Sequence, residues 1–297
     1  MPGGAMLSHR PSTPRRPKTV LAGVLGAVLA LTAATAGTAA AAPPPAKERL
    51  TPGTAYMGVG QRVHEGTAPE NGPSLGAQAH TSGVQGIDVS HWQGSINWSS
   101  VRNSGIQFAW IKATEGTSYE DPRFGANYVG AYNAGVIRGA YHFALPNVSS
   151  GSVQANFFAS NGGAWSRDNL TLPGVLDIEH NPYGAMCYGL STTQMRSWIN
   201  DFYTTYKART GRDVVIYTTA SWWNTCTGNW TGMYSKSPLW VAHWTSSETP
   251  TIPNGFPTWT VWQYTSTGSV GGVSGNVDRN KFNGSRDRLL ALANNTP

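Results

Sequence analysis

This chain of 297 residues carries little charge, since Lys, Arg, Asp and Glu together make up only 12% of it. The net charge of +6 depends on the N-terminal part: from residue 80 onward there are 14 basic and 12 acidic residues, a net charge of +2. Nucleic-acid-binding proteins normally present a concentrated basic patch. The composition therefore argues against a nucleic acid as the partner.

Cysteine is also scarce, with only Cys187 and Cys226 in the whole sequence. Two cysteines are too few for a zinc finger, and no Cys/His spacing of that kind is present. In an exported protein such a pair is expected to form one structural disulfide. We expect neither a metal ion nor a cofactor.

Motifs of three common enzyme classes are missing or out of place as well. No G-x-G-x-x-G follows the first predicted strand, which argues against a doubly wound nucleotide-binding sheet. The one G-x-S-x-G, Gly72 to Gly76, lies in a Pro/Gly-rich stretch and does not follow a predicted strand, so it does not indicate a nucleophile elbow, and no H-E-x-x-H is present. The chain is instead rich in aromatic residues, with 12 Trp and 12 Tyr. Such side chains suit the binding of a neutral or mildly acidic polymer.

The first 42 residues have the composition of a secretory signal. Basic residues from Arg10 to Lys18 precede an apolar run from Val20 to Ala36, and small residues follow up to Ala42. Arg15 and Arg16 hint at twin-arginine export. A retained membrane anchor is the alternative, but the run is mostly Ala, Gly and Thr and favours cleavage. We therefore expect a secreted, extracellular protein that has no membrane contact after cleavage.

Residues 43–79 are rich in Pro, Gly and small polar residues and show no apolar periodicity. This composition predicts a disordered pro-segment or linker. Residues 80–297 then form a single catalytic domain, which we expect to be a monomer.

Within this domain, strand-like segments alternate with helical patterns. The predicted strands are 86–90, 108–112, 136–142, 174–177, 214–217, 239–242, 258–264 and 277–282. The clearest helix begins with a capping box, Ser191 to Gln194, and ends at Gly211. Alternating parallel β/α units with eight strands predict an α/β fold of the TIM-barrel type. The last three connections are short or Gly-rich, so we expect an irregular barrel with helices missing or reduced there.

One strand carries a pair of acids at its end. Asp177 and Glu179 are two residues apart, so their side chains project from the same face while Ile178 points away. Two neighbouring carboxylates repel each other, and the pKa of at least one is expected to rise. A neutral carboxylic acid of this kind can donate a proton near neutral pH. A helix cap and an ion pair are the structural alternatives.

Polar residues follow every predicted strand, as expected of an active site at the carboxyl ends of a parallel barrel. They are Asp88, Lys112 with Glu115, Tyr141 with His142, Asp177 with Glu179, Tyr217, His243 with Trp244, Gln263 and Asp278. Carboxyl groups among Trp and Tyr favour sugar cleavage. The same acids with His142 could hold a metal ion for hydrolysis, although His142 could equally be a core residue. Trp222 and Trp223 could line the cleft or fill the core.

Six motifs stand in the order found in glycoside hydrolase family 25 lysozymes, and the sequence especially resembles the secreted actinobacterial members. They are Gly86-Ile-Asp88-Val-Ser90-His-Trp-Gln93, Phe108-Ala-Trp-Ile-Lys112-Ala-Thr-Glu115-Gly116, Gly139-Ala-Tyr-His142-Phe, Leu176-Asp-Ile-Glu179, Trp262-Gln263-Tyr264 and Val277-Asp278. The motifs cover residues 84–285. The resemblance implies an N-acetylmuramidase that cuts the β-1,4 bond between N-acetylmuramic acid and N-acetylglucosamine in peptidoglycan.

The resemblance also implies roles for individual residues. Glu179 corresponds to the acid/base, and Asp88, Asp177 and Asp278 complete the catalytic set. The expected substrate-binding residues are Lys112, Glu115, Tyr141, His142, Tyr217, Trp244 and Gln263. The substrate's acetamido group, assisted by Asp177, could attack the anomeric carbon, or Asp88 or Asp278 could supply a second carboxylate. The rivals are a non-catalytic module that binds cell-wall glycan and a chitinase-like glycosidase.

Overall fold

The computed structural model describes residues 50–64 and 83–297, without the side chains of residues 62–64. The predicted signal (1–42) lies outside these residues, as do residues 43–49 and 65–82 of the predicted pro-segment and its junction with the domain. Among the described residues, no helix combines the length and the apolar character needed to cross a membrane.

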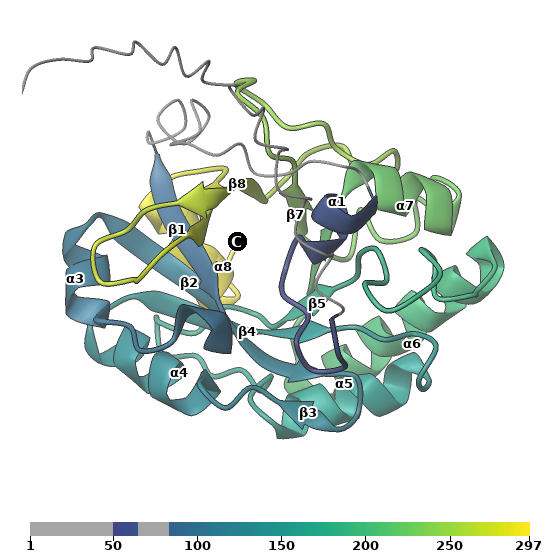
Figure 1. Cartoon of the computed structure of the whole chain (residues 1–297), viewed down its shortest axis with the longest axis horizontal. Coiled ribbons are helices and arrows are strands. Elements are labelled where there is room, and N and C mark those ends of the chain that lie inside the picture. The colour runs from purple at the N-terminus through teal and green to yellow at the C-terminus, as the bar shows by residue number, and fades with distance from the viewer. Residues whose placement is uncertain (1–49, 65–82) are drawn as a thin grey trace, which may run out of the picture. The chain divides into compact units, whose positions relative to one another are not determined.

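Eight strands close into a barrel in the order β1, β2, β4, β5, β6, β7, β8, β9 and back to β1 (Figure 1). Their bounds are β1 Val84–Val89, β2 Ile106–Glu115, β4 Ile137–Phe143, β5 Val175–Asp177, β6 Val215–Thr218, β7 Leu239–Ala242, β8 Val261–Gly268 and β9 Val277–Phe282. A two-residue strand, β3 (Tyr119–Glu120), pairs with the end of β2. The prediction of an eight-stranded α/β barrel is confirmed.

The direction of the last strand differs from the prediction of parallel units. Neighbours from β1 round to β8 are parallel, but β9 runs antiparallel to both β8 and β1. Residues 269–276 are too few for a crossover helix, whereas a short connection readily joins antiparallel strands. As a result the beginning of β9 lies beside the end of β1, and Asp278 is in register with Asp88.

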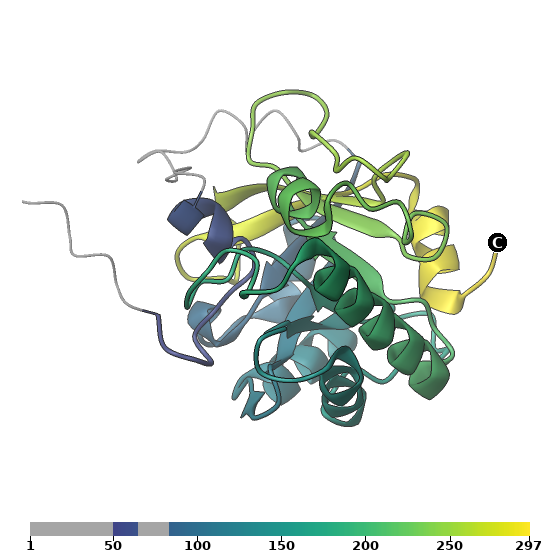
Figure 2. The same cartoon turned by 90° about the vertical axis from the view of Figure 1, so that its right-hand side faces the viewer.

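Helices surround the barrel, and α5 and α6 lie side by side on its outside (Figures 1 and 2). The bounds are α3 Trp98–Asn103, α4 Phe124–Asn133, α5 Gly151–Ser160, α6 Thr192–Thr210, α7 Ala220–Thr227 and α8 Arg286–Asn294. A one-turn helix, η1 (His91–Gln93), follows β1. The predicted start and end of α6 are confirmed, because Ser191 and Gln194 form a capping box and Gly211 adopts a left-handed conformation.

Helix α7 occupies one of the connections expected to lack a full helix. Thr219 caps its first turn, and Trp222 and Trp223 are both fully buried in the core between the barrel and its helices. Of the two alternatives for this Trp pair, core filling is therefore correct. Cys226 on α7 forms the predicted disulfide with Cys187 of the loop before α6.

The inside of the barrel is filled by aromatic side chains. Trp110 and Trp240 pack against each other with ring centroids 4.7 Å apart, and the rings of Tyr217 and Trp240 lie edge to face. Leu289 and Ala293 of α8 belong to the same buried cluster. In Figure 2 helix α8 and the segment 50–64 lie on opposite sides of the barrel. The interior is thus a packed core, and the chemistry must lie at its mouth.

Part of the predicted pro-segment is ordered, contrary to our expectation of a disordered linker. Residues 50–64 include a short helix, α1 (Val59–His64), and Ala55, Met57 and Val59 are each at most 1% exposed. These apolar side chains are spaced two apart along a segment that is mostly irregular, and they pack on barrel residues. Because their burial depends on the barrel, no local periodicity reveals it.

Candidate active site

The four predicted catalytic acids come together at the mouth of the barrel. Asp88 lies at the end of β1 and Asp278 at the start of the reversed β9, directly opposite in register. Asp177 is the last residue of β5, and Glu179 follows two residues later. Burial, and then the charges of Asp88 and Glu179, raise the pKa values of both Asp177 and Asp278, so the acids form a single electrostatic cluster.

Asp88 is held by two amide donors. Its Oδ2 accepts hydrogen bonds from Nδ2 of Asn280 at 2.7 Å and from Nε2 of Gln263 at 3.0 Å. Burial raises the pKa of Asp88 to about 6, although these bonds and one with Asp278 act to lower it. The larger effect is the loss of hydration of the charged form.

Asp177 is the most isolated of the acids. It is fully buried, and neither carboxyl oxygen has a hydrogen-bond partner among the described residues. Burial, and next the charge of Glu179, raise its pKa well above the ordinary value. Buried polar groups are nearly always hydrogen-bonded, so two bare oxygens at the mouth of a barrel indicate a place for a ligand. Asp278 shows a similar rise in pKa, caused by burial and the charge of Asp88.

Glu179 is fully buried and meets the segment 50–64. Its Oε1 accepts a hydrogen bond from the backbone N–H of Gly58 at 2.6 Å, and its Oε2 accepts one from Gly60 at 2.9 Å. Both carboxyl oxygens of the predicted acid/base therefore contact backbone of the N-terminal segment.

Gln263 links three further residues of the predicted site. Its Oε1 accepts hydrogen bonds from the hydroxyl of Tyr217 at 2.8 Å and from the indole N–H of Trp244 at 3.1 Å. These two donors fix the orientation of its amide, so that Nε2 points to Asp88. Gln263 thus positions Asp88 relative to Tyr217 and Trp244.

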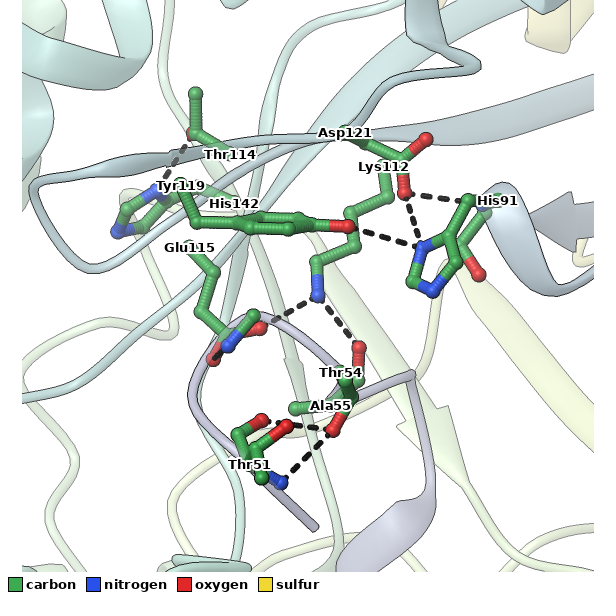
Figure 3. Close-up of polar contacts among 12 residues, drawn as sticks. Thr51, Thr54, Ala55, His91, Lys112, Thr114, Glu115, Tyr119, Asp121 and His142 are labelled. Carbon is green, nitrogen blue, oxygen red and sulfur yellow. Dashed lines mark hydrogen bonds and ion pairs between the residues drawn. The ribbon is translucent and has the colours of Figure 1, made fainter.

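Lys112 and Glu115 form a buried ion pair beside the acids, with Nζ of Lys112 2.6 Å from Oε2 of Glu115. Figure 3 shows the ammonium group of Lys112 between the carboxyl group of Glu115 and the carbonyl of Ala55. The hydroxyl of Tyr183 donates to Oε1 of Glu115 at 2.7 Å. These polar groups lie at the end of β2 and extend the site away from Glu179.

Comparisons with known proteins match residues 87–273 to the model of "Glycosyl hydrolases family 25". The chain is 69% identical over 298 residues to Lysozyme M1 of Streptomyces globisporus, and the match covers 100% of both chains. It is 44% identical over 213 residues to an N,O-diacetylmuramidase of a Chalaropsis species, covering 71% of this chain and 99% of that one. The crystal structure of a bacterial lysozyme from Streptomyces coelicolor matches with a TM-score of 0.72 and 78% identity, over 73% of this chain and all of that one.

The chain belongs to glycosyl hydrolase family 25.

In this family 25 domain the predicted substrate-binding residue His142 points away from the barrel interior. Adjacent residues of β4 point to opposite sides, so Tyr141 lies in the barrel interior and His142 outside it. His142 bonds to Thr114 and Gln154 and stacks on Phe202. Burial lowers its pKa to about 4, so it is a neutral core residue. Its expected part in substrate binding is therefore wrong, and of the two alternatives for His142, a metal ligand or a core residue, the core residue is correct.

Three residues of the site were not predicted. Asn280 lies two residues after Asp278 on β9, and this same-face spacing could have revealed it. Tyr183 and Tyr188 stand in the loop after Glu179, where no pattern marks them. Tyr188 is buried with φ +60°, and its hydroxyl has no partner within the described residues. Burial, then the charges of Glu179 and Asp177, raise its pKa well above the ordinary value.

Within residues 50–64 and 83–297, no group of three or more His, Cys, Asp and Glu side chains is arranged to hold a metal ion. In the family 25 site, Asp88 bonds to two side-chain amides and to Asp278, and Glu179 bonds to backbone N–H groups.

Proposed function

We propose that this protein is a lysozyme that hydrolyses the β-1,4 bond between N-acetylmuramic acid and N-acetylglucosamine in peptidoglycan. The observation that carries the proposal is the cluster of four buried acids, in which Asp177, with two carboxyl oxygens that no described residue contacts by a hydrogen bond, lies two residues before Glu179. The names of the relatives, a lysozyme and an N,O-diacetylmuramidase, support the choice of this bond. The signal-like residues 1–42 further support export to the compartment where peptidoglycan lies.

In the proposed mechanism Glu179 donates its proton to the oxygen of the leaving sugar. The acetamido group of the other sugar then attacks the anomeric carbon, and its N–H is held by an oxygen of Asp177. Glu179 finally takes a proton from water as the water opens the cyclic intermediate. The two bare oxygens of Asp177 support this route, because they offer acceptors where no residue of the described chain donates. In this route Asp88 and Asp278 do not react themselves, and they contribute to the electrostatic field around the sugar.

This route predicts the stereochemistry of the reaction. Two successive displacements at the anomeric carbon give a product with the configuration of the substrate. NMR of the first product formed should therefore show the β anomer. An initial α anomer would instead indicate direct attack by water, with Asp88 or Asp278 as the base.

Substrate choice separates the proposal from its two rivals. The protein is tested both intact and cut between residues 64 and 83, because residues 50–64 contact Glu179. Both forms are incubated with defined muropeptides and with chitin oligomers. Mass spectrometry should find muropeptides with a new N-acetylmuramic acid reducing end. Cleavage of chitin oligomers alone would support a chitinase-like enzyme, and binding without any cleavage would support a glycan-binding module.

A further inference from the structure

The segment 50–61, which precedes the region matched to the family, touches the site at several points. At one end it covers the proposed acid, because the N–H groups of Gly58 and Gly60 bond to the two oxygens of Glu179 at 2.6 and 2.9 Å. A substrate oxygen that takes the proton of Glu179 must come within hydrogen-bond reach of one of these two oxygens, and backbone of the segment already lies there.

At the other end the segment bonds to the pair formed by Lys112 and Glu115. The N–H of Gly53 donates to Oε1 of Glu115 at 2.7 Å, and the carbonyl of Ala55 accepts from Nζ of Lys112 (Figure 3). The N–H of Ala55 donates to the hydroxyl of Tyr183 at 3.0 Å. Most of these bonds use backbone groups of the segment and side chains of the barrel.

A tryptophan beside the site contributes a further bond. Trp92 is 48% exposed, which is unusual for so large an apolar side chain, and its indole N–H donates to the carbonyl of Thr54 at 3.0 Å. Its ring also meets that of Tyr56 edge to face at 6.4 Å. Exposed aromatic rings of this kind provide stacking surfaces for sugars.

Between the two ends the segment inserts a side chain into the mouth of the barrel. Met57 is 1% exposed and belongs to the buried cluster that contains Tyr141, Tyr217 and Trp240. Burial of this apolar side chain stabilises the contact. The segment therefore fills the mouth as well as crossing it.

Glycines allow the backbone to come this close. A Cβ on Gly60 would lie 2.3 Å from Cβ of His180, and one on Gly58 would lie 2.6 Å from Cζ2 of Trp244. Gly58 also has φ +79°, a conformation that other residues rarely adopt. The sequence of the segment is thus fitted to the cleft.

From these contacts we propose that residues 50–61 are an inhibitory segment that occupies the glycan-binding cleft until the chain is cut between residues 64 and 83. The inference rests on the proposed function. Backbone amides carry the same N–H and C=O groups as the acetamido substituents of peptidoglycan, so the segment satisfies the site as a substrate would. Cutting turns an intramolecular contact into an intermolecular one, and dilution then releases the segment.

The test compares the full chain without its signal before and after cutting at a protease recognition sequence inserted between residues 64 and 83. Binding of an N-acetylglucosamine oligomer is followed by tryptophan fluorescence, and hydrolysis of peptidoglycan by the release of reducing ends. After cutting and dilution, both the affinity and the rate should rise at least about tenfold, given the loss of the tether. A synthetic peptide of residues 50–64 should reverse the gain.

A substitution in the segment provides the matched control. Gly60→Val places a side chain against His180 and Glu179 and should raise oligomer binding in the uncut chain. The control Gly125→Ala lies on helix α4, where an added Cβ meets open space. It should leave oligomer binding by the uncut chain unchanged. Equal oligomer binding before and after cutting would overturn the inhibitory segment. Gain of binding without any peptidoglycan cleavage would instead overturn the proposed function.

Discussion

Burial sets the pKa values of single residues of the site. Asp88 and Asp177 both lie where water cannot hydrate a carboxylate, and both have raised pKa values. Their surroundings nevertheless differ, because Asp88 has two amide donors and Asp177 has none among the described residues. The same residue type is therefore held by hydrogen bonds at one position and left without them at the other.

Asp88 should give the stability of the protein a particular dependence on pH. Its pKa is 3.8 in the ordinary state and about 6 when folded, so its contribution is complete below pH 3.8 and is lost as the pH rises through 6. A shift of this size corresponds to about 3 kcal/mol. His142, whose pKa is lowered, makes the stability depend on pH in the opposite direction. A variant of Asp88 keeps His142, so the contribution of His142 cancels when the variant is compared with the original protein.

The variant Asp88→Asn keeps both hydrogen bonds, because its amide oxygen can accept from Asn280 and Gln263. Its side chain does not titrate, so it loses no proton as the pH rises. Between pH 4 and pH 7 the free energy of unfolding of the original protein should fall by about 3 kcal/mol relative to this variant. Urea unfolding at several pH values measures the difference. Parallel stability curves for the two proteins would show that Asp88 does not titrate in this way.

Asp177→Asn tests the proposed partner of the acetamido group. An amide fills the same volume but cannot carry the charge that stabilises a positively charged intermediate. We expect kcat to fall at least about 100-fold, the loss typical of a missing electrostatic group. The melting temperature should be unchanged or higher, since a buried ionisable group is removed. The exposed substitution Asp287→Asn serves as the control, and a rate like that of the control would refute the role.

The acids of the site could be predicted from the sequence because strand alternation is a local rule. Asp177 and Glu179 share a face for that reason. The same rule, applied to Tyr141 and His142, shows that only one of the two could face the cleft, and we expected both. Tyr183 and Tyr188 reach the site through a loop, whose path depends on the packed barrel.

At the level of elements, the reversed strand β9 is the main departure from a regular barrel. Its direction brings Asp278 and Asn280 to the mouth from the beginning of a strand, whereas the other acids come from strand ends. Eight strands and most helices were predictable from periodicity and caps. The direction of β9 was missed, although the connection 269–276 is too short for a parallel crossover and so carried the signal.

The disulfide joins two elements of the outer layer and should contribute to global stability. Cys187 and Cys226 are 39 residues apart, and closing a loop of this length stabilises a fold by about 2–4 kcal/mol. The double substitution of Cys187 and Cys226 by Ser should lower the unfolding free energy by that amount. Guanidinium unfolding with and without reductant measures it. If reduction left the unfolding midpoint of the original protein unchanged, the bond would have no such role.

For the molecule as a whole, the contact between residues 50–64 and the barrel is the feature furthest from sequence reasoning. Composition alone predicted a linker, because Pro, Gly and small polar residues dominate residues 43–79. The buried positions of Ala55, Met57 and Val59 exist only against the barrel surface. A segment that folds on a partner surface carries little signal of its own.

The central claim is that Glu179 is the acid of a peptidoglycan hydrolase, and its most direct test is the rate of reducing-end release from peptidoglycan. The cut protein is compared with its Glu179→Gln variant, and with Glu120→Gln as a control at an exposed position. The account predicts a loss of at least about 100-fold for Glu179→Gln, with an unchanged melting temperature and a normal rate for the control. A near-normal rate for Glu179→Gln would contradict it.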